Sequence, residues 1–114
     1  AYNGATASGN IDMGIYDAKG PKLVSIGSTA QAGTNALQTF DITDTVLGSG
    51  RFYLAVAMDN ATGTLFRTAI AVQLLSALGV CQQATAFALP ATATFAAMAS
   101  TALPVIGLAT RTTF

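Results

Sequence analysis

The chain has 114 residues, enough for one domain with a core of moderate size. Apolar residues make up 52% of it and charged residues 9%, against about 25% charged in an average globular domain, so the composition excludes a disordered protein. The net charge is zero and the chain contains no His and no Glu, which excludes a basic nucleic-acid-binding stripe and removes most of the usual groups of acid–base catalysis.

The first predicted element is a β-hairpin. Ile11, Met13 and Ile15 alternate with polar or small residues, a spacing typical of a strand with one buried face. Residues 17–21 read Asp-Ala-Lys-Gly-Pro, which is turn chemistry because Asp opens turns, Gly accepts positive φ and Pro cannot donate to a ladder. Residues 23–26 are then the return strand.

Three more strands are expected in the first part of the chain. After a polar loop that reaches residue 36, residues 37–42 predict a strand with Phe40 and Ile42 inward and Gln38 on the same face. Both faces of residues 51–58 are largely apolar, so this strand is predicted to be central and covered on both sides. A turn at residues 59–63 leads to a short strand at residues 64–68.

One short helix is predicted near residues 69–78. Ile70, Leu74 and Leu78 recur there at helical spacing, and Gly79 is well placed as a C-terminal cap. A buried strand is the alternative for so short a run.

The 43 positions between Arg67 and Arg111 contain no charged residue. Ala, Thr and Pro dominate residues 84–103, where Pro90 predicts an extended segment that lies on a neighbour or across the chain's own sheet. Residues 103–112 predict a final strand. Polar residues interrupt every window of about 20 positions, so we expect no membrane span.

Strands at intervals of about ten residues, divided by Gly, Asn and Asp turns, predict a mainly β fold of the antiparallel β-sandwich or jelly-roll class. Residues 1–114 are expected to form a single domain. Residues 1–68 are its strand-rich half, and residues 69–114 are an uncharged packing half with an extended C-terminal segment. The absence of an initial Met favours a processed or partial product of a longer protein.

The carboxylates favour turn structure over a metal site. The acids lie in or beside predicted turns, where Asp side chains cap local N–H groups; they are Asp12, Asp17, Asp41, Asp44 and Asp59. A Ca²⁺ site built from loop carboxylates is the alternative, although no EF-hand spacing is present. A glycosidase pair is not indicated, since no acid shows a partner.

Two other side chains have a functional and a structural interpretation. Cys81 is expected as a small core residue, because it has no cysteine partner, no His for a zinc site and no cationic neighbour. Tyr16 is expected on the outward face of its strand, where it either packs against a cross-strand neighbour or stacks on a ligand. No catalytic, cofactor-binding or metal-binding residue is therefore predicted, and we expect no enzyme activity.

Several segments carry a family resemblance. Residues 2–17 read YNGATASGNIDMGIYD, residues 40–44 read FDITD, and residues 47–55 read LGSGRFYLA; Leu23-Val24-Ser25 and Leu103-Pro104-Val105 accompany them. Together they resemble a β-sandwich module of tailed-bacteriophage virion proteins. The resemblance covers most of the chain, but its motifs specify turns and strands, not a site. One departure is that a strand precedes the Asn-Gly turn in such modules, whereas here only Ala1 and Tyr2 do.

This resemblance implies a structural component of the virion, of the capsid decoration, cement or tail-fibre type, assembled in the host cytoplasm. It implies a homo-oligomer, with a trimer as the expected form, and partners that are sister subunits and other virion proteins, not nucleic acid or a membrane. Burial of the apolar C-terminal half is the expected mechanism.

Two alternatives stay open. The same strand signature is similar to secreted accessory sandwiches of the pre-peptidase and carbohydrate-binding type, so one alternative is a receptor- or carbohydrate-binding module of a phage fibre or secreted protein. The other is a processed fragment of a larger secreted protein.

Overall fold

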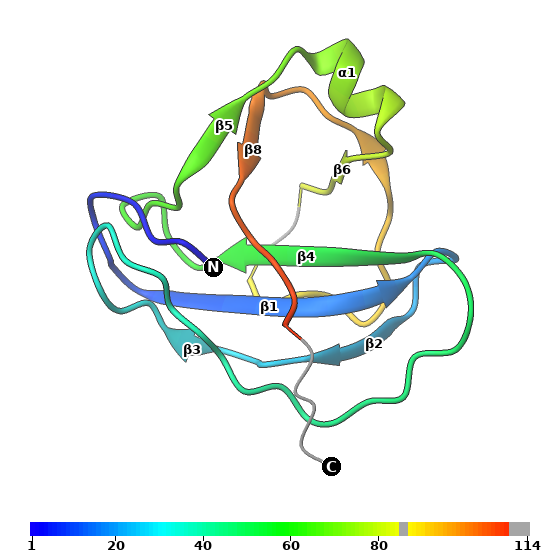
Figure 1. Ribbon diagram of the computed structural model, residues 1–114, viewed down its shortest axis with the longest axis horizontal. Coiled ribbons are helices and arrows are strands. Elements are labelled where there is room, and N and C mark those ends of the chain that lie inside the picture. Colours follow the sequence, from blue (N-terminus) through cyan, green and yellow to red (C-terminus); the bar gives the residue numbers. More distant parts are fainter. Residues whose placement is uncertain (85–86, 110–114) are drawn as a thin grey trace.

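The computed structural model describes residues 1–84 and 87–109. The fold is mainly β, with antiparallel sheets and one short helix, as the sequence predicts (Figure 1). Among the described residues, the strands form one four-stranded sheet and two separate two-stranded ribbons.

Strand β1 (Asn10–Asp17) is the centre of the four-stranded sheet. On one side it pairs antiparallel with β2 (Lys22–Ser25) and, near its other end, with β3 (Thr29–Ala30). On its other side it pairs along its length with β4 (Phe52–Met58). β1 is therefore the most enclosed strand, and it is buried from Ile11 to Tyr16.

The predicted hairpin is confirmed in β1 and β2. Asp17 accepts a backbone hydrogen bond from Gly20 at 2.9 Å, and its Oδ1 accepts one from the Lys19 N–H at 2.8 Å. Gly20 has a φ of 114°, a conformation that side chains rarely adopt. Asp17 thus accepts hydrogen bonds within the turn and Gly20 supplies its positive φ, as these residue types predict.

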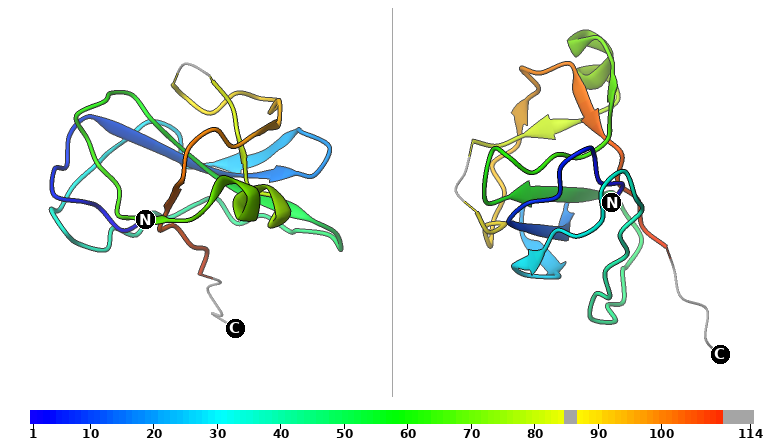
Figure 2. Two further views of the ribbon diagram at one scale, coloured as in Figure 1. Left: turned by 90° about the horizontal axis from the view of Figure 1, so that it is seen from above. Right: turned by 90° about the vertical axis from the view of Figure 1, so that its left-hand side faces the viewer.

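Strand β4 forms as predicted, but the prediction that it is central is wrong. It pairs with β1 alone among the described strands, so it is an edge of its sheet. All seven of its residues are half-buried, because other segments cross both of its faces. Figure 2 shows the chain after β8 on one face of the sheet and the residues before β7 on the other. Coverage of the two faces by such segments produces the same apolar pattern as a central position.

The second half of the chain forms the two ribbons beyond the β4 edge. β5 (Arg67–Ala69) pairs antiparallel with β8 (Ala102–Pro104), and β6 (Cys81–Gln82) pairs antiparallel with β7 (Ala96–Ala97). Figures 1 and 2 both show β6 on the side of β4 that faces away from β1. The extended segment predicted at residues 84–103 thus contributes two short strands, with residues 85–86 outside the described chain.

The predicted helix is present as α1 (Val72–Ala77). It ends in a Schellman motif: Gly79, at a φ of 74°, donates to Ser76, and Val80 donates to Leu75. Gly79 caps the helix as its position in the sequence indicates. No helix among the described residues has the length and apolar character that crossing a bilayer requires.

Two predicted strands are wrong. Residues 38–51 carry no regular structure, and the strand expected at residues 37–42 is reduced to a single bridge between Leu37 and Tyr2. The final strand expected at residues 103–112 is confined to β8, residues 105–109 are not a strand, and the rest lies outside the described residues. Of the strand expected at residues 64–68, only residues 67 and 68 belong to a strand, β5, which continues to Ala69. β3 lies in the segment that was predicted to be a polar loop.

The main core lies on one face of the four-stranded sheet. Ile11 and Met13 of β1 pack there with Ala1, and partly buried residues surround them: Ile26, Phe40, Val56, Met58, Leu65 and Ile106. On the opposite face, Leu89 packs over β1, where its Cδ1 would lie 3.1 Å from a Cβ placed at Gly14. Both faces of the sheet are thus covered, whereas the outer edge of β4 has no strand partner among the described residues.

Candidate functional site: an apolar slot beside the open edge of β4

The backbone of β4 carries hydrogen-bonding groups that point away from β1. The Asp59 N–H donates to the Asn10 carbonyl at 3.1 Å. These two residues directly follow the register pair of Ile11 and Met58 in the ladder between β1 and β4. Because bonded pairs alternate along an antiparallel ladder, the N–H and C=O groups of Tyr53, Ala55 and Ala57 face β1. The N–H and C=O groups of the intervening residues point away from β1; these residues are Phe52, Leu54, Val56 and Met58. Among the described residues, no backbone partner meets them on that side.

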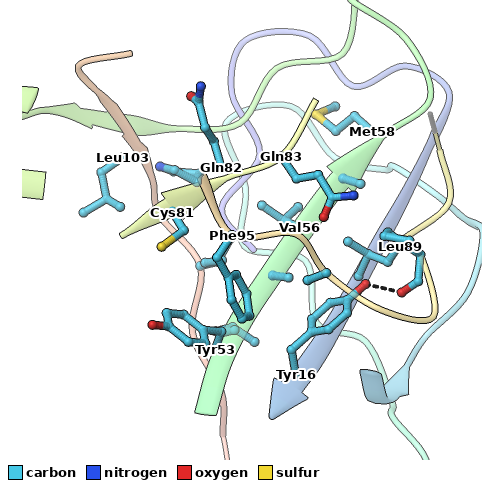
Figure 3. Close-up of a pocket in the computed structure, with 17 residues that line it drawn as sticks. Tyr16, Tyr53, Val56, Met58, Cys81, Gln82, Gln83, Leu89, Phe95 and Leu103 are labelled. Atoms are coloured by element: carbon cyan, nitrogen blue, oxygen red, sulfur yellow. Dashed lines mark hydrogen bonds between the residues drawn. The ribbon is translucent and has the colours of Figure 1, made fainter. Parts of the chain in front are cut away.

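A cavity of about 580 Å³ runs along this edge. We call it the β4 slot. Its lining comprises Tyr16 and residues 53–58 of the sheet, residues 81–83 opposite them, Leu89, Pro90, Ala93 and Phe95 on one face, and Leu103, Pro104 and Ile106 on the other. Figure 3 shows β6 and β4 as the two sides of this space, with Gln83 and Val56 between them. The slot is therefore bounded by strands on two sides and by crossing segments on its faces.

Aromatic contacts and hydrogen bonds hold one wall of the slot. The rings of Tyr53 and Phe95 lie with their centroids 4.4 Å apart (Figure 3). The Tyr16 hydroxyl donates to the Pro90 carbonyl at 2.5 Å. Gln83 Oε1 accepts the Thr94 N–H at 2.7 Å. These bonds tie residues 90–95 to β1 and to the residue after β6.

Tyr16 is not on an open surface. It is 2% exposed, and Leu89 and Pro90 cover the face of β1 that was predicted to point outward. Tyr53 is its cross-strand partner, as the packing interpretation of Tyr16 predicts. Burial raises the pKa of the Tyr16 hydroxyl, and the nearby Asp12 carboxylate raises it further.

Cys81 lies on β6 and lines the slot. It is half-buried, and its Sγ lies 3.5 Å from the Gly79 carbonyl. It thus occupies a less enclosed position than the predicted core site.

The five carboxylates do not converge. Asp41, Asp44 and Asp59 are exposed, and Asp17 belongs to the first turn. Asp12 is 1% exposed, and its Oδ2 accepts the Leu89 N–H at 3.1 Å. No group of three or more potential metal-ligating side chains occurs within the part of the chain that the structure describes. The turn interpretation fits Asp17, whereas Asp12 is a buried residue that anchors Leu89 over β1.

A second hollow of about 450 Å³ lies on the core face of the sheet. Its lining includes Met13, Ile15, Phe40 and residues 105–109. Leu37, 68% exposed, and Leu108, 53% exposed, also border it. Apolar side chains thus reach solvent at this hollow as well.

Exposed apolar residues occur in both halves of the chain, although the sequence placed the packing surface in the second. Eight large hydrophobic residues of the described chain are exposed: Leu23, Leu37, Val46, Phe66, Leu74, Leu78, Val105 and Leu108. Leu74 lies on α1 and Leu78 directly follows this helix, which stands at one end of the molecule (Figure 1). Val105 and Leu108 lie on the segment after β8. Such surfaces are typical of regions that contact other proteins.

The β4 slot offers apolar contact and backbone hydrogen bonds. The titratable side chains in its lining are Tyr16, Tyr53 and Cys81, and no lining residue is charged. The sequence pattern of residues 52–58 contained the relevant signal, an uncharged strand without proline, but it could not show that one edge was open. No family model matches this chain, and comparison with the curated proteins and with the solved structures found no match.

Proposed function

We propose that this chain is a non-enzymatic structural component of a bacteriophage particle, of the capsid decoration, cement or tail-fibre type. It assembles as a homo-oligomer with sister subunits and other virion proteins, and a trimer is the expected form. The observation that carries this proposal is the set of exposed leucine and valine side chains in the second half: Leu74, Leu78, Val105 and Leu108.

Burial of these side chains is the physical basis of the proposal. Transfer of a leucine side chain from water to an apolar interface contributes roughly 1.5–3 kcal/mol. α1 itself carries no charged residue, because the uncharged run extends from residue 68 to residue 110. Burial of this helix in an interface therefore requires no desolvation of a charged side chain on it.

The resemblance to virion sandwich modules supports the same function. The sheet of β1 to β4 contains the GIYD and FYLA segments on paired strands, with Tyr16 opposite Tyr53. We propose that the fold becomes a jelly-roll-like sandwich within the assembled particle, where neighbouring subunits complete it. The virion is then the site of function, after assembly in the host cytoplasm.

Light scattering coupled to size-exclusion chromatography tests the assembly of the purified chain. We expect a defined oligomer at micromolar concentration that dissociates on dilution. A stable monomer at all concentrations would contradict the proposal. Mass spectrometry of purified phage particles that encode the chain tests its location, and its absence from such particles would contradict a virion role.

A further inference from the structure

We draw no further inference here: the strongest candidate, the apolar hollow of about 450 Å³ on the core face of the four-stranded sheet, between residues 37–42 and residues 105–109, carries none, because nothing in the described part of the chain shows what covers it.

Discussion

A network of buried amides holds the N-terminal segment against the middle of the chain. Asn3 is fully buried, and its Nδ2 donates to the Ala32 carbonyl at 2.6 Å and to Gln38 Oε1 at 2.9 Å. Its Oδ1 accepts from Gln31 Nε2 at 3.0 Å. Each amide group thus bonds to a segment distant in sequence. A satisfied network of this kind stabilises one arrangement, because loss of a member leaves buried groups unpaired.

Asn3→Ala is therefore expected to destabilise the fold by about 1–3 kcal/mol, the usual cost of unpaired buried polar groups. Urea denaturation followed by circular dichroism measures the change. Gln73→Ala, at an exposed position of α1, is the control and should stay within about 0.5 kcal/mol of the parent chain. An equal effect of the two substitutions would contradict a structural role for the network.

Tyr16 links stability to alkaline pH. Burial and then the Asp12 carboxylate raise its pKa above the ordinary value of 10.0, so the folded state favours the neutral phenol. This contribution is complete below pH 10 and is lost as the pH rises through the raised pKa.

Tyr16→Phe should remove this part of the pH dependence. The substitution also removes the hydrogen bond to Pro90, at a cost of about 0.5–1.5 kcal/mol at neutral pH. Unfolding curves between pH 8 and 11 measure both effects. Tyr53→Phe is the matched control on the partner strand, and it should leave the alkaline decline in place.

At the scale of the elements, prediction from the sequence succeeded where a local pattern sufficed. The alternation of Ile11, Met13 and Ile15 predicted β1, and Gly79 predicted the end of α1. Residues 37–42 failed because their backbone pairing stops early: Gln38 exchanges two hydrogen bonds with Ala1, and no described backbone bond continues the pairing beyond Gln38. The Gln38 side chain adds bonds to Ala32 and Ala30, and the strand pattern does not contain them.

The close contact of β1 with β2 and Leu89 predicts a requirement for glycine at position 14. A Cβ there would lie 2.7 Å from the Val24 carbonyl oxygen and 2.9 Å from the Ser25 Cβ. Gly14→Ala is therefore expected to destabilise the chain by about 1–3 kcal/mol through overpacking.

Thermal unfolding measures this effect, with Gly48→Ala as the matched control. A Cβ at Gly48 would meet no atom within 4 Å, so that substitution should be nearly neutral. A neutral Gly14→Ala would mean that β2 and Leu89 pack less tightly on β1 than the structure shows.

At the scale of the whole molecule, composition indicated an apolar surface but not the position of the candidate site. The apolar pattern of β4 fits a central strand as well as an edge strand covered on both faces. The difference depends on where β6 and the segments around residues 90 and 105 lie, which is set by contacts between residues far apart in sequence. Strand patterns contain no information on those contacts.

The exposed face of α1 gives a prediction about the stability of the assembly. Leu74 and Leu78 are one helical turn apart, and they are 52% and 63% exposed, whereas Leu75 is buried in the chain's own fold. We expect the double substitution Leu74→Gln, Leu78→Gln to weaken association at least about tenfold, since each leucine contributes roughly 1.5–3 kcal/mol when fully buried. Light scattering over a dilution series measures the association.

Val46→Gln is the control. This residue is 98% exposed in the first half, so the substitution removes apolar surface without touching α1 and should leave the association constant unchanged. Equal weakening by both variants would point to unspecific apolar contact, and an unchanged constant in the α1 variant would remove this helix from the interface.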